Sequence, residues 1–76
     1  MDWSKALKAS FTLRDGRKLR TLSQVRVFIL ELSEQRQQDP HWRIAANLLS
    51  AAADGSTDMD ELTAQLRRAL AAEGVL

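Results

Sequence analysis

The sequence predicts a mainly helical α+β domain, in which a short N-terminal β-hairpin is followed by a three-helix bundle. Two observations predict this class: a turn dipeptide separates two short segments of alternating apolar residues, and three later stretches repeat apolar residues at helical spacing. The 76 residues form a single small domain, 1–76, because a second hydrophobic core would not fit. We expect the hairpin over about residues 10–20 and helices over about residues 22–36, 40–53 and 57–73.

The hairpin turns at Asp15-Gly16, a dipeptide typical of tight β-turns. A two-residue loop would divide the neighbouring apolar residues between two faces. A three-residue loop over residues 14–16 places Phe11 opposite Leu19, and Leu13 then shares their face. Burial of one face fixes the register of a hairpin, so we predict the three-residue loop, with Gly16 as its left-handed residue.

The segment before the hairpin gives two signals. Trp3, Leu7 and Phe11 recur at helical spacing, and Asp2 is a suitable residue to cap a short helix. The triplet at residues 11–13 alternates as a strand does. We expect a short turn or helix over residues 2–8 and a strand from about Ser10.

The first helix is predicted to begin after Thr21, which forms a capping box with Gln24. It is expected to fade through the polar run at residues 34–38. Its core stripe consists of Val25, Phe28, Ile29 and Leu32. Val27 and Leu30 lie off that stripe and make the apolar face wider than a surface helix needs.

The second helix begins at Asp39-Pro40, where aspartate caps and proline occupies the first helical position, and it ends at Gly55. The third follows residues 56–58 and closes at Gly74, with Val75 contacting Leu70. The short connection predicts that these two helices pack antiparallel. Their core stripes are Trp42, Ala45, Leu48, Leu49 and Ala52, and then Met59, Leu62, Leu66, Ala69 and Leu70.

Composition limits how so small a domain can be stabilised. It has no cysteine, which excludes disulfides and thiolate metal sites, and its single histidine cannot build a zinc site alone. Association with a second copy or with another protein is the remaining route to extra stability.

Charge is divided unevenly along the chain. Residues 1–28 carry seven basic and two acidic side chains, a net +5, whereas residues 29–76 carry four basic and eight acidic, a net −4. Such asymmetry can mark a docking face, a dipole that pairs two copies, or ordinary solvated surface.

The sequence offers little for catalysis or cofactor binding. His41 lies in the first turn of a helix without a nucleophile motif, which favours a solvated or packing role. The acidic run at residues 54–61 places its glycine second, which is the wrong register for a calcium loop. No glycine-rich phosphate loop is present. We therefore expect a protein that is not an enzyme and that uses no cofactor, metal or small-molecule substrate.

Val27 and Leu30 are the candidate protein interface. Either the hairpin or the Trp3 segment covers them, or they form a surface for another protein or a second copy of this chain. The leading hypothesis is a small protein-interaction or regulatory module that self-associates.

The alternative hypothesis is weak nucleic-acid binding by the basic hairpin. Its candidate contacts are Arg14, Arg17, Lys18 and Arg20, which could follow phosphates. A net charge near zero and the absence of aromatic residues among these basic ones argue against it.

The stretch from Asp15 to Leu22, together with Trp42 and the closing residues 74–76, resembles a group of small uncharacterised bacterial proteins, chiefly alphaproteobacterial. The resemblance implies a bacterial origin and no particular activity. The apolar cluster from Val25 to Leu32 is interrupted by two charges and is too short to span a bilayer, and no signal-peptide core follows the N-terminus. We expect a cytoplasmic protein without a membrane partner.

Overall fold

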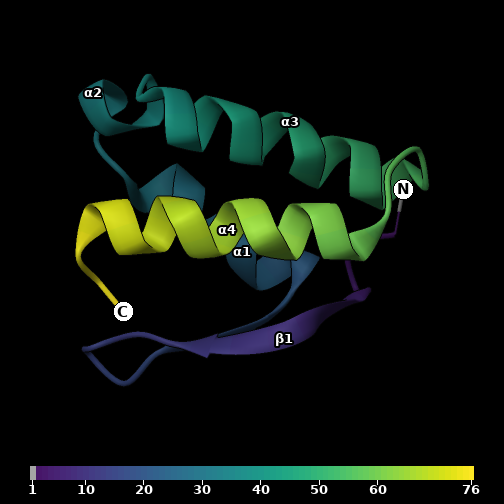
Figure 1. The fold of residues 1–76 in the computed structure, drawn as a ribbon, viewed down its shortest axis with the longest axis horizontal. Coiled ribbons are helices and arrows are strands. Elements are labelled where there is room, and N and C mark those ends of the chain that lie inside the picture. The colour runs from purple at the N-terminus through teal and green to yellow at the C-terminus, as the bar shows by residue number, and fades with distance from the viewer. Residues whose placement is uncertain (1) are drawn as a thin grey trace.

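Two strands and four helices follow one another along residues 2–76, the part of the chain that the computed structural model describes. The predicted class, a hairpin followed by three packed helices, is confirmed. Figure 1 shows α4 and α1 between the hairpin on one side and α3 on the other. The elements are β1 (Ala6–Thr12), β2 (Lys18–Thr21), α1 (Leu22–Glu31), α2 (Glu34–Gln37), α3 (Pro40–Asp54) and α4 (Met59–Glu73).

The hairpin has the predicted register. Phe11 lies opposite Leu19, and the Leu13 amide donates to the Arg17 carbonyl at 2.7 Å, which leaves a three-residue loop. Gly16 closes that loop with a φ of +94°, a left-handed conformation that a side chain would strain. Phe11, Leu13 and Leu19 are all buried, so the burial of one face does decide the pairing.

The prediction for residues 2–8 is wrong in part, because β1 begins at Ala6 and not near Ser10. A turn precedes it, in which the Asp2 carboxylate accepts from the Ser4 amide and caps no helix. Leu7 is buried and Ala9 half-buried, so inward positions alternate along the whole strand. The small side chain of Ala9 conceals this alternation in the sequence.

Helix α1 begins as predicted. The Thr21 hydroxyl accepts from the Gln24 amide, and the Gln24 side chain accepts from the Thr21 amide. The first turn gains further partners, since the amides of Leu22 and Ser23 donate to carbonyls of the segment that precedes β1. These bonds satisfy amides that a helix start leaves free, and they hold that segment against α1.

The predicted end of this helix is wrong. It stops at Glu31, five residues earlier than expected, because the backbone becomes extended at Leu32. The Ser33 hydroxyl then accepts from the Arg36 amide and starts the separate four-residue helix α2. Serine favours a cap over a helix interior, which explains the break.

Helices α3 and α4 run antiparallel, as predicted (Figure 1). Asp39 caps α3 and Asp58 caps α4, so α4 starts at Met59, two residues later than expected. The predicted close at Gly74 is confirmed by its φ of +75° and by the bond from the Val75 amide to the Leu70 carbonyl at 3.3 Å.

The core lies where the three longer helices and the inner hairpin face meet. Trp42 is only 1% exposed, and its indole Nε1 donates to the Glu73 carboxylate at 3.1 Å. This bond satisfies the one polar group of the buried ring and links the start of α3 to the end of α4. In residues 2–76, no helix combines the length and apolar composition that a membrane crossing requires.

Candidate interaction surfaces

Two large apolar side chains project from the outer side of α1. Val27 is 52% exposed and Leu30 is 65% exposed, and they are three residues apart, so they lie on the same side of the helix. Neither the hairpin nor the Trp3 segment covers these two side chains, so the alternative that they are buried within the monomer is wrong. Their neighbours Phe28 and Ile29 are buried in the core.

A shallow hollow of about 240 Å³ lies on the β2 side of this pair. Val27 lines it together with Phe28 and Leu19, so its wall is largely apolar. Charged and polar side chains surround the opening, and they come from Arg17, Lys18, Gln24 and Glu31.

A second hollow of about 270 Å³ lies on the α3 side. Leu30 and Trp3 line it, and the Arg26 guanidinium lies 5.0 Å from the centre of the Trp3 ring. The remaining lining residues are Ile29, Ala46, Leu49 and Ser50. We call Val27, Leu30 and these two flanking hollows the α1 face.

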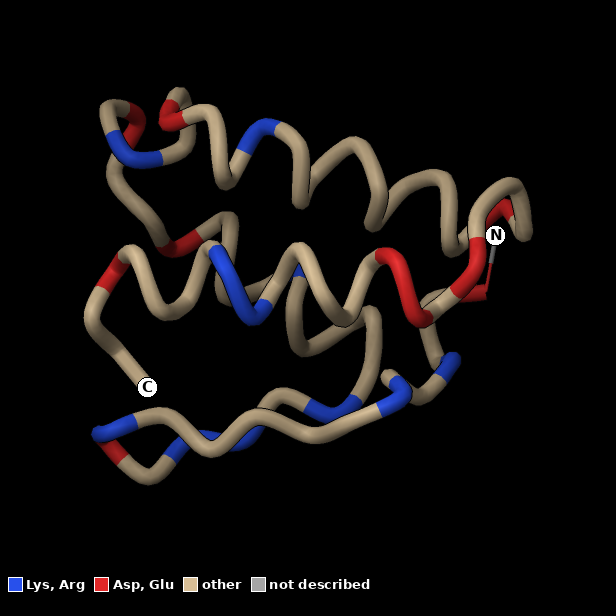
Figure 2. Tube along the Cα trace, in the orientation of Figure 1, with Lys and Arg blue, Asp and Glu red and all other residues tan. Residues whose placement is uncertain are grey.

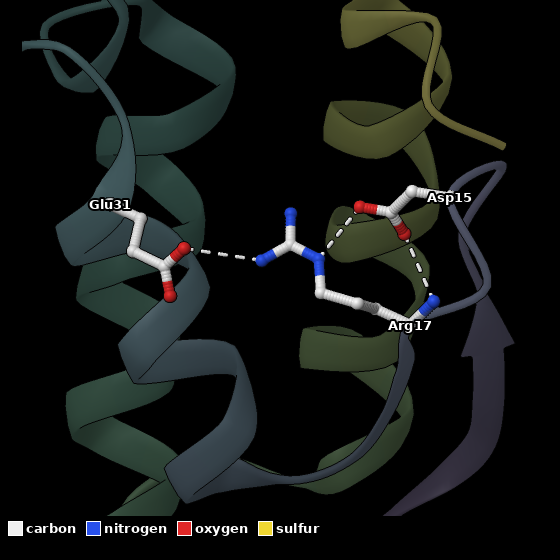
Figure 3. A network of polar contacts seen from close by, with 3 residues as sticks. All are labelled: Asp15, Arg17 and Glu31. Carbon is white, nitrogen blue, oxygen red and sulfur yellow. Dashed lines mark hydrogen bonds and ion pairs between the residues drawn. The ribbon is translucent and has the colours of Figure 1, made fainter.

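The four basic hairpin residues do not form one cluster. Figure 3 shows the Arg17 guanidinium between the loop and α1. It forms an ion pair with Asp15 of the loop at 2.8 Å and a second ion pair with Glu31 of α1 at 3.2 Å. The same guanidinium lies 5.4 Å from the centre of the Phe28 ring. Arg17 is therefore committed to contacts that hold the loop against α1.

These contacts shift the pKa values of Asp15 and Arg17. Hydrogen bonds from the Arg17 amide and then its side chain lower the pKa of Asp15 below its ordinary value. The bond to Asp15 in turn raises the pKa of Arg17, and the Glu31 carboxylate adds to that effect. Both groups therefore stay charged at neutral pH.

Arg14 is also engaged within the molecule. Its Nε donates to the Leu76 carbonyl at 2.8 Å, and its amide donates to the Val75 carbonyl at 2.8 Å. These bonds tie the hairpin loop to the end of the chain that follows α4. Of the predicted nucleic-acid contacts, only Lys18 and Arg20 point from β2 into solvent without an ion-pair partner in residues 2–76.

Three further basic residues, which were not predicted as contacts from the sequence, lie in this hairpin or beside it. Lys8 of β1 and Arg67 and Arg68 of α4 line an open hollow of about 470 Å³. The Arg67 guanidinium lies 5.8 Å from the Phe11 ring centre. Figure 2 shows basic positions along the hairpin and α4, and acidic ones gathered near the α3–α4 turn. Lys8 could have been identified from the sequence if the strand had been predicted to begin at Ala6, because Lys8 then lies on its outer side.

The residues considered for catalysis or metal binding are separate from these surfaces. His41 is exposed in the first turn of α3. The acidic run at 54–61 ends α3 and starts α4, with Asp58 as the cap. Within residues 2–76, no group of three histidine, aspartate or glutamate side chains is close enough to share a metal ion.

Comparisons of the chain with protein-family models, with the curated proteins and with the solved structures find no match. The geometry of the two surfaces therefore carries the functional inference by itself.

Proposed function

We propose that this protein is a small non-catalytic interaction or regulatory module that associates with a second copy of itself through the α1 face. The observation that supports it is the pair Val27 and Leu30, each more than half exposed on a helix whose other side is fully packed. Clustered exposed apolar side chains usually mark a protein interface. A chain this small gains stability from covering them.

The arrangement of the face suits a two-fold contact. In an antiparallel pairing of two α1 helices, Val27 of one copy packs on Leu30 of the other, and the reverse contact follows by symmetry. Arg26 and Glu31 lie on opposite sides of this pair and carry opposite charges. The edges of the face therefore carry both a positive and a negative charge. A helix of 10 residues is only about 15 Å long, which makes this a small contact and a concentration-dependent dimer.

Sedimentation velocity over a range of protein concentrations tests the proposal. The wild type is expected to shift toward a dimer as concentration rises. Val27→Glu and Leu30→Glu should stay monomeric, because dimer formation would bury an unpaired carboxylate in the contact. Ile44→Glu is the matched control, since Ile44 is 50% exposed on α3 and lies outside the α1 face. A wild type that stays monomeric throughout, or a control that dissociates as readily, would contradict the proposal.

Nucleic-acid binding by the hairpin is a second candidate function, which the exposed Lys18 and Arg20 favour. Arg14 and Arg17 do not support it, because both are held by other parts of the molecule.

A further inference from the structure

The outward side of the hairpin presents mainly basic and hydroxyl side chains. Its side chains alternate with the buried Leu7, Phe11 and Leu19 and are all exposed. We call this set the outer hairpin face, and it consists of Lys8, Ser10, Thr12, Lys18 and Arg20. Three of these side chains are basic, two are hydroxyls and none is acidic. Ala6, at the start of β1, is the one apolar residue exposed on the same side of the strand.

Helix α4 extends this basic surface along β1. Arg67 and Arg68 line the hollow beside Lys8, where Thr63 accepts from the Lys8 amide at 3.4 Å. Asp60 is the one carboxylate among the lining residues of that hollow. The ion pairs within residues 2–76 involve only Arg17 and Arg36, so the five basic side chains of this surface have no carboxylate partner there. Arg68 donates to the Gln65 side-chain oxygen at 3.2 Å, and Arg67 lies over the Phe11 ring, contacts that leave the positive charge of both side chains uncompensated.

From this arrangement we propose that the outer hairpin face binds duplex DNA, with the two-stranded ribbon in the major groove and Arg67 and Arg68 on the adjoining phosphates. A groove about 12 Å wide admits a two-stranded β-ribbon. Lysine and arginine donate to guanine, and serine and threonine hydroxyls bond to several bases. Basic side chains beside the ribbon neutralise backbone charge and set its position on the duplex.

Other nucleic acids fit this surface less well. Single strands are held by aromatic side chains on which bases stack, and the outer hairpin face has none. Phe11, Phe28 and Trp42 are buried, and Trp3 lies in the hollow between α1 and α3. The major groove of duplex RNA is deep and narrow, so side chains on a ribbon cannot read its bases. Duplex DNA is the polyanion that matches both the shape and the hydrogen-bonding groups.

Fluorescence anisotropy with a labelled 20-base-pair DNA duplex tests this assignment at a series of salt concentrations. At physiological salt the dissociation constant is expected on the order of 1–100 µM, the range of non-specific binding. The plot of log K against log salt should have a slope of about −1.8, because Arg67 and Arg68 contact phosphates and each contributes about −0.9.

Single substitutions locate the contact. Arg67→Gln should make the slope shallower by about one, and Lys8→Gln and Arg20→Gln should weaken binding. Arg43→Gln, at an exposed arginine on α3, should leave both the slope and the affinity unchanged. Circular dichroism checks that each variant keeps its fold. An equal loss with Arg43→Gln would overturn the proposal, because it would indicate general charge attraction.

Three competitors complete the test. The same sequence as an RNA duplex, the same sequence as single-stranded DNA, and poly-L-glutamate should each bind more weakly than the DNA duplex. Tighter or equal binding of any of them, or no binding to the duplex at 100 µM and low salt, would overturn the assignment. The inference rests on the second candidate function above. The outer hairpin face shares only Lys18 with the α1 face, so DNA binding can fail while self-association stands, and the reverse.

Discussion

The α1 face and the outer hairpin face are both exposed, yet their chemistry is opposite. The α1 face presents Val27 and Leu30 between hollows with apolar walls, and charges of both signs at its margins. The outer hairpin face presents hydroxyl groups and basic groups that have no carboxylate partner within residues 2–76, and it has no large apolar side chain. An apolar face gains free energy by leaving water, whereas a basic one gains it by displacing counterions from a polyanion. The comparison teaches that one small fold can offer two surfaces for two kinds of partner.

The sharpest contrast lies within α1, between neighbouring residues. Phe28→Ala should lower the free energy of unfolding by about 3–5 kcal/mol, since Phe28 is buried against Trp42 with ring centres 5.5 Å apart. Val27→Ala should change the free energy of unfolding of the monomer by less than about 0.5 kcal/mol. Urea denaturation at low protein concentration measures both. Similar losses for the two variants would mean that Val27 is part of the monomer core and not of an interface.

The hairpin can be weakened at Gly16, which does not line the α1 face. Gly16→Ala should lower the free energy of unfolding by roughly 1–2 kcal/mol, because alanine is strained at the left-handed φ of Gly16. No neighbouring atom contacts the added methyl group, so no steric clash adds to this loss. Thermal unfolding gives the loss, and sedimentation velocity should show unchanged association. The matched control is Ser10→Ala, which should leave stability nearly unaltered because its side chain is exposed. Loss of association in Gly16→Ala would show that the two faces are coupled.

The helix start that supports the α1 face gives a smaller effect. Thr21→Ala should lower the free energy of unfolding by about 1 kcal/mol, because the Gln24 amide loses its hydroxyl acceptor. Thr21→Ser keeps an acceptor and should retain most of that stability. Chemical denaturation compares the two variants. Equal losses would point to packing of the threonine methyl group and away from capping.

The loop that joins the two faces should show the smallest effect, a weak dependence on pH. Arg17 lowers the pKa of Asp15 below its ordinary value of 3.8. A carboxyl whose folded pKa is depressed contributes stability above its unfolded pKa and loses it as pH falls through the folded pKa. NMR titration should therefore place the Asp15 pKa below 3.8, and Arg17→Met should raise it. The substitution keeps the Arg17 amide, which is the larger cause of the lowered pKa, so an unchanged pKa in that variant would remove only the Arg17 side chain as a cause.

Much of the fold could be predicted from local sequence. The hairpin register followed from the shared face of Phe11, Leu13 and Leu19, and the helix caps followed from Thr21 and Asp39. These features depend on residues close together in the chain, where turn chemistry and apolar spacing act directly.

What could not be predicted depends on contacts between distant segments. The start of β1 was concealed by the small Ala9, whose inward position appears only when the strand packs on α4. Arg17 was predicted as a candidate nucleic-acid contact, but its side chain reaches Glu31, 14 residues away, once the loop lies against α1. Lys8 and Arg67 are far apart in sequence and share a hollow only because β1 and α4 pack together.

The claim that the α1 face is an interface is tested most directly by ¹H–¹⁵N NMR spectra recorded as the protein is diluted. The account predicts concentration-dependent shifts in the amides of residues 26–31 and in the Trp3 indole, with residues 8–12 unchanged. Spectra that do not change with concentration, or shifts confined to the hairpin, would contradict it.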